Sequence, residues 1–338
     1  MTRARKELIQ LETTPYYHCI CRCVRQAFLC GRDAASGRSF EHRKHWVVER
    51  LEVLQAVYAV EICAYAVMSN HYHLAVRLDP GQAQEWSEEE VVERWSRLFS
   101  LPVLVRRYRS GDVETRAEQH QARGLIGQWR ERLSNLSWFM RSLNEHLARR
   151  ANEEDGCRGR FWEGRFKCQA LLDEAAVLTC MSYVDLNPVR AGIADTPEAS
   201  DFTSVQQRIT GYRRRTETSR RCNPQRPLPR LMELQGGAAG RHSNCIAFST
   251  EDYLELVDWA GRAIRADKRS SIPGRLPPIL ERLKLNPEYY LRHVRRGGRA
   301  HHVVALGRVD RIRQAAERLG RRFLKGMGAS RRLYQVPA

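Results

Sequence analysis

The stretch VEICAYAVMSNHYHLAVRLD (residues 60–79) contains two largely apolar runs separated by a short polar break at Ser69 and Asn70. Runs of this length that are rich in β-branched and aromatic residues and bounded by turn residues are typical of strands. The stretch therefore predicts a strand pair. Side chains two positions apart on a strand share a face, so we expect His71 and His73 to point the same way.

The residues before this pair predict a strand and a helix. The sequence TPYYHCICRCV (residues 14–24) is rich in aromatic, β-branched and cysteine residues and predicts a strand. A turn-like stretch follows, and then apolar residues recur at helical spacing over residues 40–58. This order predicts a helix packed on a sheet.

The residues after the pair predict two further helices and another strand. Residues 80–132 are polar and lack strand periodicity, so we interpret them as a helical insertion. A core helix is expected over residues 133–150, and residues 159–172 predict a strand. Asp173 is suited to cap the next helix, which should end near Asn187 because Pro188 disfavours a helical residue before it. The apolar stripe of the core helix is Leu136, Phe139, Met140, Leu143 and Leu147.

The resulting order is strand, helix, strand, strand, helix, strand, helix, which is the split βαβ, ferredoxin-like arrangement with one helix added. We therefore expect an α+β fold with the helices on one face of the sheet. The predicted domains are a catalytic domain over residues 14–195, a basic linker over 196–247 and a mostly helical basic extension over 248–330.

The net charge of +18 is unevenly distributed along the 338 residues. Lys and Arg against Asp and Glu number 28 and 27 in residues 1–200, but 29 and 12 in residues 201–338. A basic segment of this kind favours a polyanion such as nucleic acid through phosphate neutralisation, although a solvated surface is an alternative. No apolar run reaches the ~18 residues that span a bilayer, and the first ten residues lack a secretory pattern. We expect a soluble, cytoplasmic, nucleoid-associated protein.

The ten cysteines do not form a CxxC pair. In a cytoplasmic protein they are expected to be reduced thiols. Cys19, Cys21 and Cys23 alternate on the first strand, and we interpret them as buried apolar side chains, since structural zinc sites usually draw on two separated pairs.

Two pairs of residues are candidates for chemistry. His71 and His73 can offer two imidazoles to one divalent ion, although two structural histidines would give the same pattern. Tyr183 and Asn187 lie four residues apart on the final helix and share a face. Taken alone, Tyr183 is equally compatible with a core residue, and Asn187 with a residue that ends the helix before a proline.

Four blocks of sequence resemble a known family, and this resemblance favours a functional role for both pairs over a structural one. In order along the chain they are YHCICRCVRQAFL (17–29), VMSNHYHLAV (67–76), GRFWEGRFK (159–167) and YVDLNPVRAG (183–192). Together they resemble the REP-associated tyrosine transposases, which belong to the single-tyrosine HUH (IS200-like) transposases. The resemblance covers residues 14–195 and implies cleavage and rejoining of single-stranded DNA near hairpins.

The resemblance also implies a role for each candidate. Tyr183 would be the nucleophile that forms a 5′-phosphotyrosine link, and His71, His73 and Asn187 would hold a divalent metal such as Mg²⁺ or Mn²⁺. The DNA-binding residues we predict beside the blocks are Arg22, Arg25, Arg160, Trp162, Arg165 and Lys167.

Two rival functions remain at this stage. One is a catalytically silent regulator that binds hairpin DNA, and the other is a metal-dependent phosphodiesterase that uses water in place of tyrosine. Joining two DNA ends requires two nucleophiles or two sequential events, so a homodimer and a monomer both stay open.

Overall fold

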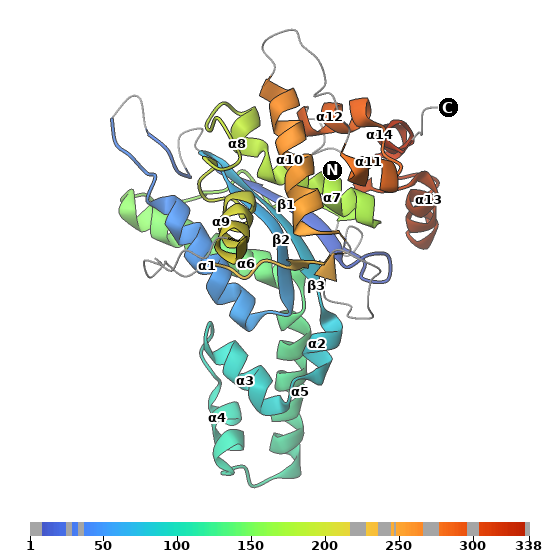
Figure 1. Cartoon of the computed structure of the whole chain (residues 1–338). Helices are drawn as coiled ribbons and strands as arrows, with labels where there is room; N and C mark the ends of the chain where they lie inside the picture. Colours follow the sequence, from blue (N-terminus) through green and yellow to red (C-terminus); the bar gives the residue numbers. More distant parts are fainter. Residues whose placement is uncertain are drawn as a thin grey trace.

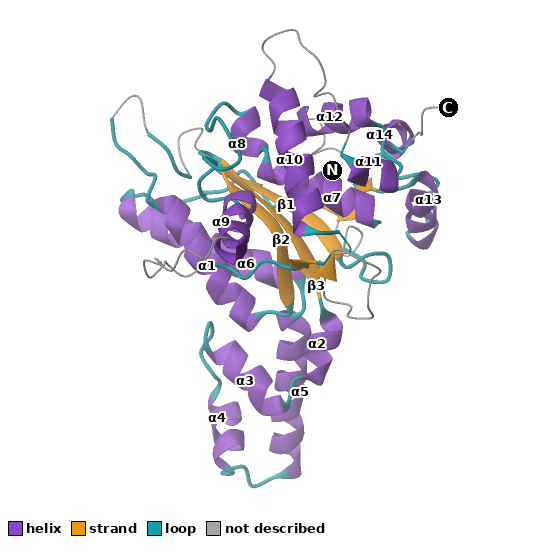
Figure 2. Ribbon diagram, in the orientation of Figure 1, coloured by secondary structure: helices purple, strands orange, loops and turns teal. Residues whose placement is uncertain are grey.

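A five-stranded, mostly antiparallel sheet lies at the centre of the computed structural model (Figures 1 and 2). Its strand order is β2-β3-β1-β4-β7, and only the β4–β7 pair is parallel. The strands are β1 (Tyr16–Arg22), β2 (Val60–Val67), β3 (His71–Leu78), β4 (Lys167–Leu171) and β7 (Ala305–Leu306). The structure describes residues 9–24, 29–32, 37–216, 228–235, 245–246, 248–265, 277–295 and 304–334. The predicted α+β class is confirmed.

The register of β1 and β3 places the histidines on one face of the sheet. Arg22 lies opposite His71, and Ile20 lies opposite His73. Because paired residues in an antiparallel ladder share a face, His18 on β1 points to the same side as both. Cys19, Cys21 and Cys23 alternate with these residues and are buried on the other side, as predicted.

Two helices cover the cysteine face. They are α1 (Arg43–Val57) and α6 (Leu136–Glu154), which pack on each other and on the sheet. All five residues of the predicted apolar stripe on α6 are buried. The helix begins where the Asn135 side chain accepts hydrogen bonds from Ser137 N and Trp138 N.

The histidine face is covered by α7 (Glu174–Asp185), which contacts β2, β3 and β4. Asp173 caps it as predicted, since its side chain accepts from Ala176 N at 2.9 Å. The expectation that the helices lie on one face is therefore wrong, because they cover both. Residues Ala175 to Asp185 of α7 are all buried, the polar Thr179, Ser182 and Asp185 included, because the helix lies between the sheet and further helices.

Four helices between β3 and α6 extend away from the sheet at the bottom of Figure 1. The Ser87 and Thr115 side chains cap two of them, and Thr115 forms a capping box with Glu118. Trp95 and Trp129 stack with ring centroids 5.1 Å apart and hold the group together. The helices are α2 (Pro80–Glu85), α3 (Glu88–Ser96), α4 (Val103–Ser110) and α5 (Arg116–Leu133).

The C-terminal third packs against the outer side of α7. Side chains of α10, α11, α12 and α14 share one apolar cluster with those of α7 and α8 (Asn187–Arg190). The helices are α9 (Ser204–Thr216), α10 (Thr250–Arg265), α11 (Pro278–Arg282), α12 (Pro287–Arg295), α13 (Val309–Arg318) and α14 (Met327–Leu333), and a small parallel sheet joins β5 (Glu233–Leu234) to β6 (Cys245–Ile246). The predicted domain boundaries stay predictions. In the part of the chain that the structure describes, no helix has the length and apolar character to span a bilayer.

Arg43 joins the start of α1 to the end of α6. Its guanidinium is 1% exposed, donates from Nε to Glu154 at 2.6 Å and pairs with Asp155. We expect Arg43→Ala to lower the free energy of unfolding by about 3 kcal/mol, because it leaves two half-buried carboxylates without their cation. Chemical denaturation measures this. Arg97→Ala breaks an exposed pair with Glu93 and should cost less than about 1 kcal/mol, and equal losses would contradict the assignment.

Candidate functional site

The predicted histidine pair lies at the start of β3, and both rings are held through their Nδ1 atoms. His71 is half-buried, and its Nδ1 lies 2.6 Å from Oδ1 of Asn70 in the preceding turn. His73 is fully buried, and its ring centroid lies 4.9 Å from that of His71. The structure therefore brings the two predicted imidazoles together on one face.

His18 on β1 is a third member of this cluster. Its Nε2 lies 3.0 Å from Nδ1 of His73, and the two rings stack with centroids 5.2 Å apart. The sequence alone indicates no metal-binding role for it. The two-residue period of a strand over residues 14–24 places His18 on the face opposite the cysteines. Only the pairing of β1 with β3 shows that this face also carries His73.

Tyr183 on α7 packs against both buried histidines. Its ring centroid lies 5.4 Å from that of His73 and 5.8 Å from that of His18, in edge-on contacts. The side chain is only 2% exposed, and burial raises the pKa of its phenol to about 12. The positive charge of Arg190 and the side-chain amide of Asn187 oppose this increase. A phenol with this pKa keeps its proton near neutral pH.

Asn187 lies one turn beyond Tyr183, where α7 ends and α8 begins. It is fully buried, and its Oδ1 accepts a hydrogen bond from the guanidinium of Arg190. The Arg190 Cζ atom lies 5.4 Å from the Tyr183 ring centroid. The amide oxygen that was predicted to hold a metal ion therefore faces a permanent cation, which the sequence reasoning missed.

These contacts test how well the residues fit a divalent ion. A metal-bound histidine usually has its second ring nitrogen fixed by a hydrogen bond, and both His71 and His73 meet this condition through Nδ1. Asn187 does not fit the role of a metal ligand unless Arg190 gives up its hydrogen bond to the Asn187 Oδ1 atom. Among the residues that the structure describes, no group of three or more His, Cys, Asp or Glu side chains is arranged to hold a metal ion. The histidine pair therefore fits a divalent ion, whereas the complete predicted ligand set of His71, His73 and Asn187 does not fit one in this arrangement.

The C-terminal extension contributes His293, on α12, to the same cluster. Its ring centroid lies 6.4 Å from that of Tyr183, and burial lowers the pKa of its imidazole to about 4. The residue is therefore neutral at physiological pH. The sequence could not have indicated it, because it lies 110 residues from Tyr183 in a segment outside the four blocks.

Asp185, near the end of α7, anchors this helix to the C-terminal part and, through Ser204, to Tyr65 of β2. The hydroxyls of Ser204 and Tyr253 donate to its carboxylate, and Val205 N donates at 3.0 Å. The group is fully buried. Because Asp185 lies on the same helix as Tyr183, this network fixes where the tyrosine stands.

Burial raises the pKa of Asp185 from 3.8 to about 6, against the opposing effect of hydrogen bonds from Ser204 and Tyr253. The folded chain thus binds this proton more tightly than the unfolded chain. The stability that protonation confers is complete below about pH 4 and is lost as the pH rises through 6. We expect wild type to lose up to about 3 kcal/mol relative to Asp185→Asn between these limits. Denaturation curves at several pH values measure the difference, and parallel profiles for the two proteins would contradict it.

The predicted DNA-binding side chains lie around the His71 end of the sheet. Arg22, Arg160, Arg165 and Lys167 are exposed, and the carbonyl of Arg22 accepts from Glu163 N at 2.9 Å. Trp162 is 9% exposed, donates from Nε1 to the Asn144 carbonyl and packs edge-on against Tyr72, so base stacking would require it to leave these contacts. Arg25 lies outside the described residues.

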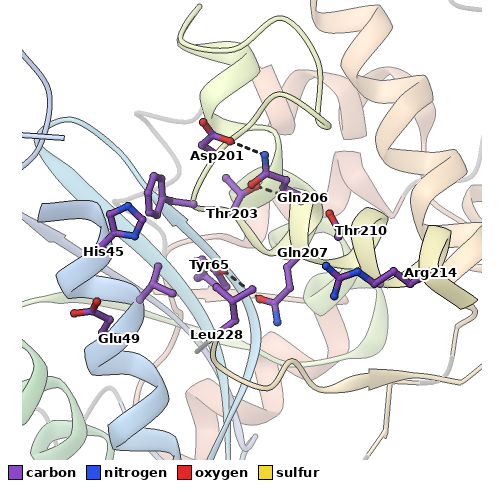
Figure 3. A pocket seen from close by; sticks show the side chains of 13 residues that line it. His45, Glu49, Tyr65, Asp201, Thr203, Gln206, Gln207, Thr210, Arg214 and Leu228 are labelled. Carbon is purple, nitrogen blue, oxygen red and sulfur yellow. Dashed lines mark hydrogen bonds between the residues drawn. The ribbon is translucent and has the colours of Figure 1, made fainter. Parts of the chain in front are cut away.

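A cavity of about 690 Å³ lies between α1 and α9 and is lined by none of His18, His71 and His73 (Figure 3). Two pairs of its polar side chains bond to each other: Tyr65 donates to Gln207 at 3.1 Å, and Gln206 donates to Asp201 at 2.6 Å. The cavity contains no residue of the candidate site.

Fold and site together define an α+β protein in which a helix-borne tyrosine is buried against histidines of two adjacent strands. The sequence matches no protein-family model, and no curated protein is significantly similar to it. One solved structure is similar, that of a REP-associated tyrosine transposase bound to a REP hairpin, at 12% identity and a TM-score of 0.37. The match covers 62% of this chain and 86% of that one. Likeness at this level shows neither family nor function, so the function rests on the residues themselves.

Proposed function

We propose that the protein is a DNA endonuclease and strand transferase of the single-tyrosine HUH type, which cleaves and rejoins single-stranded DNA near hairpins through Tyr183. The observation that carries the proposal is the contact between Tyr183 and His73, whose ring centroids lie 5.4 Å apart although 110 residues separate them in sequence. A nucleophilic side chain beside a histidine pair is an arrangement suited to phosphoryl transfer.

The strand order supports the ferredoxin-like part of the proposal. In β2-β3-β1-β4 every neighbouring pair is antiparallel, so β1 and β2 run in the same direction with β3 between them. The helix α1 connects β1 to β2 on one face. This is the order that a split βαβ unit produces, and β7 is then an addition from the C-terminal extension.

In the proposed reaction the Tyr183 Oη forms a bond to the scissile phosphorus as the bond from phosphorus to the 3′ oxygen breaks. The phenol loses its proton and the departing oxygen gains one, which leaves a 5′-phosphotyrosine link and a free 3′-hydroxyl. The reverse attack by a 3′-hydroxyl rejoins DNA without a nucleotide cofactor, because the phosphodiester energy is retained in the link. Arg190 lies beside the phenol ring, where its charge stabilises the developing phenolate.

His71 and His73 would hold a divalent ion, Mg²⁺ or Mn²⁺, through ring nitrogens that their Nδ1 contacts leave facing the site. When bound, the ion would withdraw charge from the scissile phosphate. Asn187 would join as a ligand only after its oxygen exchanges Arg190 for the metal, so Arg190 and the ion compete for one acceptor.

The Tyr183 side chain is only 2% exposed. A phosphate can therefore reach its phenol only after the side chains that cover it have moved. Helix α12 lies on α7 at this point. We therefore expect DNA binding to be accompanied by a shift of α12 or of the side chains beneath it.

The test is incubation of the purified protein with end-labelled hairpin DNA carrying single-stranded flanks, in the presence of Mn²⁺. A protein–DNA complex that survives denaturation is expected. Cleaved DNA without such a complex would indicate a phosphodiesterase that uses water, and binding without cleavage would indicate the silent regulator.

A further inference from the structure

A pocket of about 560 Å³ lies on the other side of the sheet from Tyr183, between α6 and the segment that leads into β4. Three arginines line it, Arg141, Arg160 and Arg165, against one carboxylate, Glu145. Phe161, Trp162 and Phe166 form its apolar lining. Positive charge around aromatic surface is the composition of sites that bind unpaired nucleotides.

The neighbouring side of α6 extends this pocket. Arg141, which lines the pocket, also lies over the ring of Trp138 at 5.2 Å from its centroid, and Arg132 lies over the same ring at 4.6 Å. Trp138 also packs against Trp95 and Phe99, with ring centroids 6.0 and 6.2 Å apart, so it is only partly exposed. Phe166 is a second partly exposed ring, in the segment that leads into β4.

The pocket is continuous with the candidate site at the end of β1. Cys23 forms a β-bridge with Trp162, and Val24 N donates to the Phe161 carbonyl at 2.9 Å. Arg22, the last residue of β1, lies opposite His71. The backbone that forms one wall of the pocket is therefore joined to the strand end where the histidine pair stands.

We propose that the pocket and the neighbouring side of α6 form a binding track for single-stranded DNA, in which Trp138 and Phe166 stack on unpaired bases. Arg141 lies over Trp138 and is paired with Glu145 at 2.7 Å, and it would leave both to hold a phosphate. DNA as the ligand rests on the proposed function. A single strand is favoured over a duplex because the bases of a duplex stack on one another and cannot lie flat on a protein ring.

The test compares two labelled DNAs, a blunt hairpin and the same hairpin with a tail of about 12 thymidines on either side, by fluorescence anisotropy without divalent metal. The tail is expected to strengthen binding to the wild-type protein. Trp138→Ala and Phe166→Ala should each weaken binding of the tailed DNA about tenfold and leave the blunt hairpin unaffected. Arg141→Glu, an exposed change that keeps the core intact, should act in the same direction and lessen the salt dependence.

Tyr108→Ala is the matched control. Tyr108 is also a partly exposed ring with an arginine over it, Arg123 at 5.9 Å, but it lies on α4 in the helical insertion. The Tyr108→Ala protein should bind the blunt and the tailed hairpin as tightly as the wild-type protein does. The proposed track would be contradicted if the tail added no affinity in the wild-type protein. It would also be contradicted if Trp138→Ala and Phe166→Ala weakened binding of blunt and tailed DNA equally.

The outcome is separable from that of the proposed function. The track is measured as binding to uncleaved DNA, so it can stand even if Tyr183 forms no covalent link. Conversely, a covalent link with no effect of the tail would remove the track and leave the nuclease.

Discussion

Tyr183→Phe is expected to lower the rate of covalent complex formation with DNA by at least about 10³-fold, with DNA affinity and thermal stability unchanged. Phenylalanine has nearly the same volume, so the ring contacts with His73 and His18 persist. The substitution removes only the oxygen that would form the bond to phosphorus. The measurement is a time course of denaturation-resistant complex on labelled hairpin DNA.

Tyr65→Phe is the matched control for this experiment. Tyr65 is another fully buried tyrosine whose phenol pKa is raised by burial, and it donates to Gln207 at 3.1 Å. It lies on β2, outside the histidine cluster, and should keep wild-type rates. A Tyr183→Phe protein that still forms the complex would assign the nucleophile to another residue.

The local elements could be predicted because their patterns are local. The two apolar runs and the polar break within residues 60–79 define two strands, and the 3.6-residue period of α6 defines its buried stripe. The Asp173 cap marks the start of the helix that carries Tyr183. This helix ends at Asp185, close to the predicted end, but Asn187 is itself helical because Pro188 lies in the first turn of α8. Each of these signals depends on neighbours within about one or two turns of chain.

The arrangement of helices about the sheet could not be predicted in the same way. Helix α7 is mostly apolar, which indicates that it is buried but not which elements cover it. Its outer partners come from residues 204–334. The amphipathic pattern of residues 249–265 predicts a helix there, but it does not indicate which surface the apolar face of that helix covers. Strand β7 has only two residues, too few for any periodic signal.

The residues of the candidate site also differ in whether local sequence patterns could predict their positions. The shared face of His71 and His73 follows from the period of a strand, and the proximity of Tyr183 and Asn187 from that of a helix. The positions of His18 and His293 depend on pairing between distant segments. The bond from Arg190 to Asn187 is local, at a spacing of three residues, and could have been anticipated from the turn of helix that joins them.

The contact between His18 and His73 leads to the second large effect, on metal affinity. If His73 binds the ion through Nε2, its Nδ1 carries the proton and donates to Nε2 of His18, 3.0 Å away. This fixes both the tautomer and the plane of the ligand ring. His18 would then act on the metal without touching it.

We expect His18→Phe to weaken Mn²⁺ binding by about 10- to 100-fold, and His73→Ala to weaken it further. Calorimetric titration of the DNA-free protein measures this without reference to activity. His45→Phe is the control, since this ring packs edge-on against Phe202 at 4.5 Å, away from the cluster. Equal affinities in all four proteins would place any metal outside the histidine pair. Loss in His73→Ala alone would keep the ligand and reject the orienting role of His18, because phenylalanine keeps the stacked ring but offers no acceptor for the proton on Nδ1.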